Sequence, residues 1–250
     1  MPEGDTIWRT AATLRAGLEG KRVLVARPAA LKRLAGTTVT EVKPVGKHLL
    51  IRFDNGLAIH SHMRMRGAWH LYKRGERWRR PVWQMKALLE TDDAVAVCFG
   101  APVVDLVRDE TTKVGHLGPD ILSDDWAVED VVANARALGP VAVGELLLDQ
   151  RVTAGIGNVY RCEALWQTRI NPWTKASDLG DEQIRALFET ARKAMRANLN
   201  GGFNRRFPGY GKGAVHGRGG RPCPRCGSRI QVRAQGEHAR LTYWCASCQP

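Results

Sequence analysis

Two Cys-x-x-Cys pairs near the end of the chain constrain its fold more than any other feature of the sequence. Cys223 and Cys226 are followed, after eighteen intervening residues, by Cys245 and Cys248. This spacing is typical of one Zn²⁺ ion held tetrahedrally by four thiolates. A segment of about thirty residues cannot bury enough apolar surface to fold unaided, so we expect structural zinc to order it. The alternative is a redox-active thiol pair.

The segment between the two cysteine pairs predicts a zinc-clamped β-hairpin. Residues 228–233 and 239–244 alternate like strands around a Gln-Gly turn at 235–236. A zinc ion with four thiolates carries a charge of about −2, so the arginines of the hairpin exceed what neutralisation needs. We interpret these arginines as contacts to phosphate, and the alternative is that they are exposed side chains that only meet water. These arginines are Arg229, Arg233 and Arg240.

The chain is strongly basic. Thirty-eight Lys and Arg residues against 25 Asp and Glu residues give a net charge of +13, and the last fifty residues hold nine basic residues and one acidic residue. This imbalance is untypical of a metabolic enzyme and favours a polyanionic partner such as nucleic acid. A basic surface with no such partner is the alternative.

The opening of the chain has neither the pattern of a secretory signal nor that of a transit peptide. The longest aliphatic stretches, such as residues 146–148, are too short to span a bilayer. We therefore expect a cytoplasmic, nucleoid-associated protein without membrane contact. Its cysteines should be reduced thiols or metal ligands, with Cys98 and Cys162 in the core.

The first half of the chain combines one helix with short strands. Apolar residues spaced by three and four over residues 6–18 predict an amphipathic helix, capped by Asp5 or Thr6. The segments that read as strands are 39–42, 49–53, 57–63, 87–89 and 95–99. An Asn-Gly pair at 55–56 and the turn at 91–93 indicate hairpins. We expect an antiparallel β-sandwich packed against one helix.

From residue 124 the periodicity becomes helical, and the predicted helices are 128–138, 143–149, 158–167 and 181–198. A glycine-rich run at 209–220 indicates a mobile linker. The sequence therefore predicts an α+β protein with a β-sandwich domain at 1–123, a helical domain at 124–210 and a zinc finger at 211–250.

Four segments in this order carry a signature: Met-Pro-Glu-Gly-Asp at 1–5, Gly-Lys-His-Leu-Leu at 46–50, Ala-Gly-Ile-Gly-Asn at 154–158 and the zinc hairpin. Together they resemble the Fpg/Nei family of DNA glycosylases, and the opening resembles the endonuclease VIII branch, particularly its actinobacterial members. The resemblance spans essentially the whole chain. It implies an N-terminal sandwich, a helix-two-turns-helix domain and a zinc finger, acting on double-stranded DNA with damaged bases or abasic sites.

The resemblance implies a bifunctional glycosylase and lyase that excises oxidised bases, pyrimidines above all, and cleaves the abasic strand by β,δ-elimination. If Met1 is removed, Pro2 presents a secondary amine that can form an iminium with C1′ of the damaged nucleotide. By the same resemblance Glu3 is the general acid and base. The alternative is a carboxylate that only stabilises the N-terminus of the helix through the helix dipole. Lys47, at the start of a strand, matches a phosphate-contacting lysine, although it can also snorkel to water.

Further residues are assigned to DNA binding. The glycines before Asn158 permit close backbone approach to a phosphate, and Asn158 serves as both helix cap and phosphate ligand by resemblance. Arg240 matches the zinc-finger arginine of the family. Arg64, Met65 and Arg66 lie where the family places intercalating residues, and Met65 is the candidate wedge. A methionine in the sandwich core is the alternative.

The sequence also departs from the family pattern. The Arg-Arg-Phe-Gly run with which the Fpg branch probes the opposite strand is absent, and residues 104–108 take its place. His60, His62 and His116 receive no role. We expect a monomer with one zinc ion. A catalytically silent protein that binds damaged DNA on the same scaffold remains open, as does an RNA-binding zinc-ribbon protein.

Overall fold

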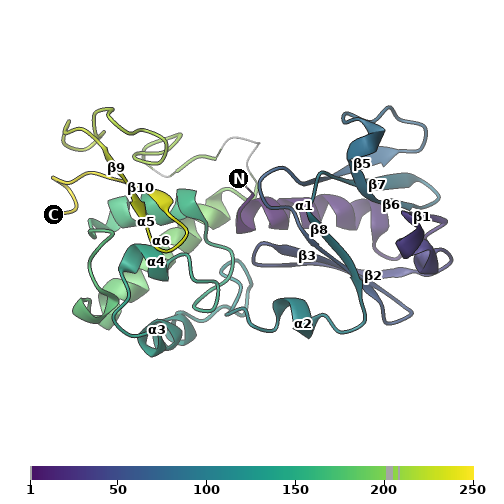
Figure 1. Cartoon of the computed structure of the whole chain (residues 1–250), viewed down its shortest axis with the longest axis horizontal. Coiled ribbons are helices and arrows are strands. Elements are labelled where there is room, and N and C mark those ends of the chain that lie inside the picture. The colour runs from purple at the N-terminus through teal and green to yellow at the C-terminus, as the bar shows by residue number, and fades with distance from the viewer. Residues whose placement is uncertain (1, 201–204, 208) are drawn as a thin grey trace. The chain divides into compact units, whose positions relative to one another are not determined.

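The computed structural model describes residues 2–200, 205–207 and 209–250, which form two compact units, 1–116 and 117–250 (Figure 1). The first unit contains an N-terminal helix and two β-sheets, and the second contains four α-helices and a terminal hairpin within its described residues. The first unit ends at His116, a few residues before the boundary expected after residue 123.

Helix α1 spans Gly4–Leu18. Its predicted apolar stripe is confirmed, because Ile7, Ala11, Leu14 and Leu18 are all buried. The predicted cap is wrong. Glu3 is the N-cap residue, since its carbonyl oxygen accepts the backbone N–H groups of Thr6 and Ile7 at 2.9 and 3.2 Å. The helix begins two residues before the predicted start at residue 6.

Two four-stranded antiparallel sheets form the first unit, with strand orders β1-β6-β7-β5 and β2-β3-β4-β8. One buried cluster draws side chains from α1 and from both sheets, so the predicted sandwich packed against one helix is confirmed. The strands are β1 Val25–Arg27, β2 Val39–Val45, β3 His48–Phe53, β4 Ala58–His62, β5 Ala68–Lys73, β6 Met85–Glu90, β7 Ala94–Phe99 and β8 Val103–Val107. Shorter elements are η1 Ala29–Leu34, η2 Val82–Gln84 and α2 Thr111–Val114.

Both predicted hairpins are confirmed, with turns at 54–57 between β3 and β4 and at 91–93 between β6 and β7. Three strands escaped the sequence pattern: β1, β5 and β8. Strand β8 is half-buried at every position and shows no alternation, and β1 has only three residues. A period of two is therefore invisible in these strands.

The second unit contains the four helices expected from periodicity: α3 Val128–Ala137, α4 Val143–Leu146, α5 Asn158–Thr168 and α6 Asp181–Ala197. A short helix, η3, covers Ala176–Asp178. The predicted hairpin is also present, formed by β9 Gln231–Gln235 paired antiparallel with β10 Arg240–Trp244. No helix among the described residues combines the length and the apolar character needed to cross a bilayer.

The glycine-rich run at 209–220 is not the mobile linker that its composition suggests. Ala214 and Val215 are fully buried. The carboxylate of Glu163 on α5 accepts the backbone N–H groups of Ala214, Val215 and His216 at 2.7, 3.1 and 2.8 Å. Burial raises the pKa of Glu163, and the three N–H bonds oppose that shift. The segment is thus fastened to α5 by a buried carboxylate whose acceptor capacity is used.

Candidate functional site

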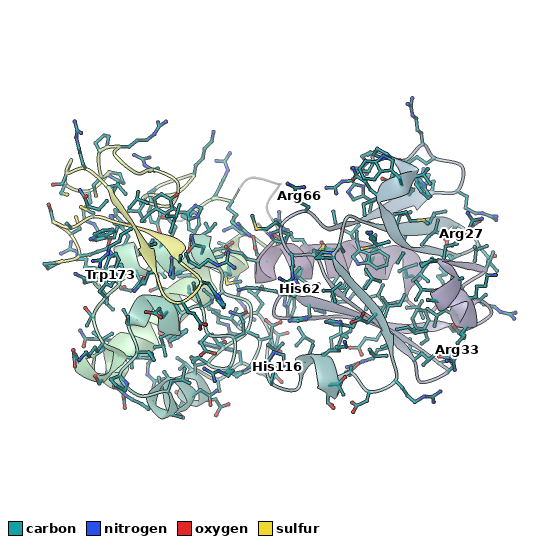
Figure 2. All side chains as sticks on the ribbon, viewed as in Figure 1. Arg27, Arg33, His62, Arg66, His116 and Trp173 are labelled. Atoms are coloured by element: carbon teal, nitrogen blue, oxygen red, sulfur yellow. The ribbon has the colours of Figure 1, made fainter. Side chains whose placement is uncertain are left out.

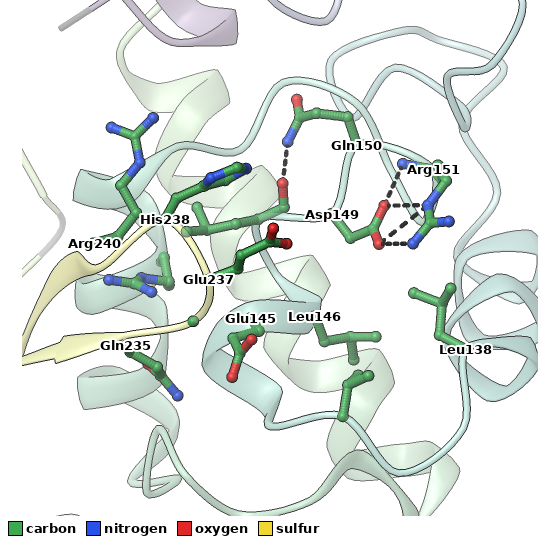
Figure 3. Close-up of a pocket in the computed structure, with 14 residues that line it drawn as sticks. Leu138, Glu145, Leu146, Asp149, Gln150, Arg151, Gln235, Glu237, His238 and Arg240 are labelled. Carbon is green, nitrogen blue, oxygen red and sulfur yellow. Dashed lines mark hydrogen bonds and ion pairs between the residues drawn. The ribbon is translucent and has the colours of Figure 1, made fainter.

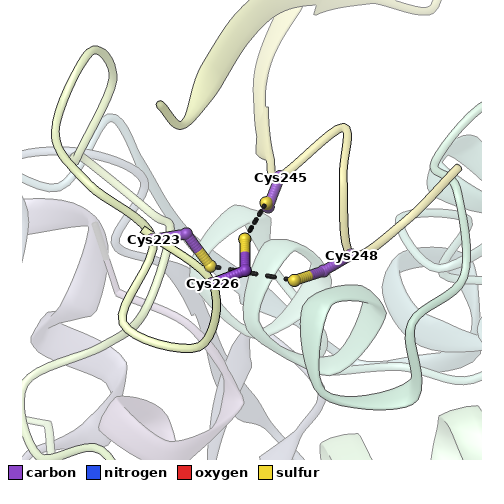
Figure 4. A group of neighbouring side chains, drawn as sticks. All are labelled: Cys223, Cys226, Cys245 and Cys248. Atoms are coloured by element: carbon purple, nitrogen blue, oxygen red, sulfur yellow. Dashed lines mark hydrogen bonds between the residues drawn. The ribbon is translucent and has the colours of Figure 1, made fainter. Parts of the chain in front are cut away.

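The four cysteines of the two Cys-x-x-Cys pairs converge on one point (Figure 4). Their sulfur atoms all lie within 4.8 Å of one another, with 3.4 Å between Cys226 and Cys245 and 4.0 Å between Cys223 and Cys248. Thiolates at about 2.3 Å from a tetrahedral zinc ion lie about 3.8 Å apart, whereas disulfide sulfurs lie about 2 Å apart. The spacing fits four ligands of one metal ion.

Groups around the first cysteine pair suit thiolate ligands, whereas burial raises the pKa of Cys245 and raises that of Cys248 to about 12. Hydrogen bonds from Ser228 lower the pKa of Cys226 to about 6, and the indole N–H of Trp166 donates to Cys223 Sγ at 3.4 Å. Trp166 belongs to α5 and shares a buried cluster with residues of the terminal hairpin. Because metal ions bind the thiolate and not the thiol, these contacts both favour the ligand form and dock the cluster on the helix.

The two isolated cysteines are core residues, as predicted. Cys98 and Cys162 are fully buried, and burial raises their pKa to about 12 and about 11. Both are therefore inert thiols in apolar surroundings.

Asn158 and Arg240, predicted to bind DNA, lie close together in the second unit. The Asn158 side-chain amide donates to the carbonyl oxygen of Leu241 at 2.8 Å, and Leu241 directly follows Arg240 in β10. Arg240 is exposed. The predicted capping role is wrong: Gly157 is the N-cap of α5, and Asn158 is its first helical residue. One hydrogen of the Asn158 amide therefore fixes the hairpin, and a second remains on the same nitrogen.

Gln150 holds the glycine-rich loop before α5, and sequence reasoning missed it. Its side-chain oxygen accepts the N–H of Gly155 at 3.0 Å, and its amide donates to the carbonyl oxygens of Leu148 and Ile156 at 2.7 and 3.2 Å. Gly155 has a φ of 115°, which favours glycine. No local pattern in the sequence marks Gln150, because its partners are backbone groups.

A fully buried arginine supports the same corner. Arg161 on α5 donates to the carbonyl oxygen of Leu241 at 3.2 Å and to that of Gly144 at 3.4 Å, and burial lowers its pKa. It borders an open hollow of about 530 Å³ between α4, α5 and the tip of the hairpin (Figure 3). Acidic residues line this hollow as well, including Glu145 and Asp149. Exposed Arg240 lines the same hollow.

The predicted wedge residues form an exposed turn after β4 in the first unit. Arg64, Met65 and Arg66 are all exposed, Met65 by 64%, and Arg64 has a positive φ of 44° (Figure 2 labels Arg66). The methionine that fills the core is instead Met63, which is 2% exposed. The alternative of a core role for Met65 is therefore excluded.

Pro2 and Glu3 lie at the start of α1, where Pro2 is half-buried and Glu3 is fully buried. Strand β2 runs antiparallel to this helix: Val39 accepts the N–H of Gly20 at 2.8 Å, and Val42 accepts the Arg15 guanidinium at 3.0 Å. Counted from the contact between Gly20 and Val39, the strand extends about 20 Å to its last residue and the helix about 24 Å to its first. The β2–β3 turn therefore lies toward the helix end that carries Pro2 and Glu3.

Lys47 is the second residue of that turn and half-buried, so the prediction that it begins the strand is wrong. Gly46, the other turn residue, has a φ of 57°. A two-residue turn of this kind joins β2 and β3 directly, since Val45 pairs with His48. The lysine side chain is thus presented by a tight turn instead of a strand face.

Three histidines that received no common role from the sequence form one cluster on β3 and β4. His48 Nδ1 lies 2.8 Å from His60 Nε2, and the His48 ring packs edge-on against His62 at 4.6 Å between centroids (Figure 2 labels His62). His62 also accepts the N–H of Arg64, in the wedge turn, at 3.2 Å. Alternation on neighbouring strands brings these rings to one sheet face, which no single stretch of sequence reveals.

Burial keeps the histidine cluster neutral. Burial is the largest cause that lowers the pKa of His48 to about 3 and that of His62 to about 4, and nearby cations including Lys47 lower both further. Burial also lowers the pKa of His60, against the opposing effect of Asp105. At neutral pH His48 and His62 are therefore uncharged, and Arg64 and Lys47 are the basic residues that act on His62.

Comparison with known proteins identifies both units. The model of the formamidopyrimidine-DNA glycosylase N-terminal domain matches residues 1–102, and that of the formamidopyrimidine-DNA glycosylase H2TH domain matches residues 117–206. "Probable endonuclease 8 2" of Streptomyces coelicolor is 43% identical and covers 100% of this chain and 94% of its own length. "DNA-(apurinic or apyrimidinic site) lyase Nei2" of Mycolicibacterium smegmatis is 38% identical, with coverage of 100% and 99%.

Solved structures share the fold along the whole chain. The MutM (Fpg) protein of Thermus thermophilus superposes with a TM-score of 0.81 at 27% identity and covers 99% of this chain and 98% of its own. The Lactococcus lactis Fpg (MutM) complex with DNA containing N7-benzyl-Fapy-dG has a TM-score of 0.83 at 22% identity, with 99% of each chain covered. The predicted α+β architecture is thereby confirmed.

The neutral histidines make stability depend on pH. Unfolded histidines take up protons near pH 6.5, whereas His48 stays neutral in the folded chain down to about pH 3. Its contribution is complete above pH 6.5 and is lost progressively as the pH falls below that value. We expect His48→Gln to flatten the slope of unfolding free energy between pH 5 and 6 by about 1 kcal/mol per pH unit.

Urea unfolding at pH 5, 6 and 7 measures this slope. The matched control is His238→Gln, because His238 is exposed. An identical slope in wild type and His48→Gln would show that His48 titrates alike in the folded and unfolded chains.

Proposed function

Because the chain belongs to the formamidopyrimidine-DNA glycosylase family, we propose that it excises damaged bases from DNA and cleaves the strand at the resulting abasic site. The observation that carries this function is similarity along the full chain to relatives named endonuclease 8 and DNA-(apurinic or apyrimidinic site) lyase. The activity is thus that of a DNA glycosylase and an abasic-site lyase. Oxidised pyrimidines are the proposed substrates within this class.

The proposed nucleophile is the amino-terminal nitrogen of Pro2 after removal of Met1. Its lone pair forms a bond to C1′, the bond from C1′ to the base breaks, and the base leaves with a proton. Opening of the sugar ring then converts the C1′ adduct into an iminium, with the ring oxygen protonated as it departs. A base takes the C2′ proton, the electron pair of that C–H bond moves into the iminium, and the C3′–O bond breaks to release the 3′ phosphate. Removal of the C4′ proton from the conjugated iminium then breaks the C5′–O bond and releases the 5′ phosphate.

Glu3 is proposed to move the protons of these steps. It lies next to Pro2 and is fully buried, and a carboxyl group in that setting can give a proton to the ring oxygen and accept one later. Lys47 is proposed to contact a DNA phosphate beside the damaged nucleotide. The antiparallel course of α1 and β2 brings its turn toward the same end of the unit, which supports this grouping.

The proposed grip on the DNA backbone is formed by Asn158 and Arg240. The Asn158 amide is bonded to the carbonyl oxygen of Leu241, the residue after Arg240, and this bond supports placing the two residues on neighbouring phosphates. Met65 is proposed to fill the gap left by the extruded nucleotide, with Arg64 and Arg66 on the flanking phosphates. The 64% exposure of Met65 supports a role outside the core.

Zn²⁺ is the proposed occupant of the four-cysteine site, where it would supply structure and no chemistry. We further propose a sandwich domain at 1–123 for catalysis, a helical domain at 124–210 and a finger at 211–250 for phosphate binding, in a monomer located in the cytoplasm at the nucleoid. The basic finger supports this division, because phosphate contacts dominate affinity for DNA.

Blocking the Pro2 nitrogen should abolish covalent chemistry. An N-terminal extension ahead of Pro2 turns its nitrogen into a tertiary amide, which has no lone pair available for attack. We expect borohydride to trap no adduct of the extended protein with abasic DNA, and protease removal of the extension to restore trapping. An adduct formed by the extended protein would assign the nucleophile to another residue, and no adduct in either form would favour the silent DNA-binding protein.

Arg240→Ala should weaken DNA binding and reduce its salt dependence. Loss of one phosphate contact lowers the slope of log Kd against log salt by about 1. Fluorescence anisotropy over a salt series measures this slope. The control is Arg185→Ala, which removes the same charge from α6, where Arg185 is paired with Glu129 at 2.6 Å. Equal slopes in wild type and Arg240→Ala would remove Arg240 from the phosphate contacts.

Removal of the metal should disorder the finger selectively. Without a ligand ion, four thiolates within 4.8 Å repel one another, so the hairpin loses its clamp. We expect backbone amides of β9 and β10 to lose protection from hydrogen exchange, while those of β3 and β7 keep it and DNA affinity falls. Undiminished DNA affinity in protein shown to be free of metal would contradict the zinc proposal.

A further inference from the structure

Trp83 has an exposure that a folding role does not explain. It lies in η2, and 79% of its surface is open to solvent. Its neighbour Val82 is 68% exposed. A tryptophan normally contributes by burying its large apolar surface, so one left in water points to a binding surface.

Trp83 and the candidate wedge Met65 line the same open hollow in the first unit, whose volume is about 640 Å³. Two hydrogen bonds to backbone carbonyl oxygens join the two loops to each other and to the end of β7. The Arg80 guanidinium donates to the carbonyl oxygen of Arg66 at 2.9 Å, and Gly100 donates its N–H to the carbonyl oxygen of Gln84 at 2.8 Å. The loop that carries Trp83 is therefore joined to the wedge turn.

The hollow also requires a glycine at its base. A Cβ at Gly67 would lie 2.6 Å from the carbonyl oxygen of Met63 and 2.9 Å from the Cα of Ala101. Gly67 therefore allows the wedge turn to pack tightly against Ala101, which lies just after β7. This packing leaves Met65 and Trp83 as the large apolar side chains that project into the hollow.

The surroundings of Trp83 are basic. Residues 73–86 contain six Lys or Arg residues and one acidic residue. Arg77, Arg79 and Lys86 are exposed, and Arg80 and Lys86 line the hollow itself. An aromatic ring among cations is complementary to a nucleobase face next to a phosphate backbone, and a solvent-facing apolar groove for a protein would not need this charge.

From these observations we infer that Trp83 stacks on the base opposite the lesion, a contact that rests on the proposed function. The chemistry draws the damaged nucleotide out of the duplex toward Pro2, and Met65 fills the gap. The base that remains beside the gap has lost the hydrogen bonds to its partner, so it can tilt out of the stack and offer its π-face to an aromatic ring. Trp83 is the aromatic side chain that lines the same hollow as the wedge, and Arg80 with Lys86 can meet the adjoining phosphate.

The experiment compares two duplexes that carry a tetrahydrofuran abasic analogue. In the first duplex the analogue faces adenine, and in the second it faces another tetrahydrofuran, so no opposite base exists. We expect Trp83→Ala to weaken binding to the first duplex by roughly 5- to 150-fold, which is the usual effect of removing one base-stacking ring. The second duplex should bind wild type and Trp83→Ala alike, and Trp83→Phe should keep most of the affinity for the first.

Val82→Ala is the matched control, because Val82 is also exposed in η2 but does not line the hollow. It should bind both duplexes like the wild type, and the melting temperatures of all three variants should equal that of the wild type. Unchanged affinity of Trp83→Ala for the first duplex would overturn the inference while leaving the proposed function standing. An equal loss on both duplexes would also overturn it, since the ring would then contact something other than the opposite base.

A wild-type chain that binds the first duplex no better than an undamaged one would refute the proposed function, and this inference with it. The two failures are therefore distinguishable from the wild-type measurement alone.

Discussion

Helix α5 buries polar groups whose partners lie mostly at the distant end of the chain, and this requirement organises the second unit. Glu163 takes three backbone N–H groups from residues 214–216, Arg161 and Asn158 share the carbonyl oxygen of Leu241, and Trp166 donates to Cys223. An unpaired charge in that interior would be costly. The same hydrogen bonds therefore dock the hairpin and satisfy the buried polar groups of the helix. They also bring Asn158 next to Leu241, the neighbour of Arg240.

In the first unit, several groups that can carry positive charge lie near one another. The amine proposed as nucleophile, the lysine proposed to contact phosphate and three imidazoles would repel one another if all were charged. Burial prevents this by lowering the pKa of His48 and His62, so that Lys47 stands beside neutral rings. His62 in turn accepts the N–H of Arg64, which links this face to the wedge turn through a neutral acceptor. Under the proposed function, catalysis and base extrusion then share one support.

Much of this arrangement could be predicted because the relevant signals are local. The stripe of α1, the Asn-Gly hairpin and the two cysteine pairs each occupy one short window with a period or a spacing of their own. What could not be predicted depends on contacts across the chain. The role of Gln150 depends on backbone partners, Asn158 turns its amide to Leu241 instead of capping its helix, and the glycine-rich run at 209–220 is ordered by Glu163. Composition alone predicts a flexible segment here, because it does not contain the distant carboxylate that accepts the backbone N–H groups of the run.

The distribution of charge explains why the finger has to be present for the proposed activity. The helical domain at 124–210 holds eleven basic and eleven acidic residues and so has no net charge, whereas the finger at 211–250 holds seven basic residues and one acidic residue. Residues 1–116 hold twenty basic and twelve acidic residues, with six of the basic ones in the segment that carries Trp83. Phosphate contacts supply affinity without sequence information, and contacts with bases supply discrimination. Under the proposed function, most of the attraction of the second unit for DNA therefore comes from its finger, and Asn158 adds a contact from the helical domain. The first unit pairs its charge with exposed Met65 and Trp83, which we propose to act at the damaged site.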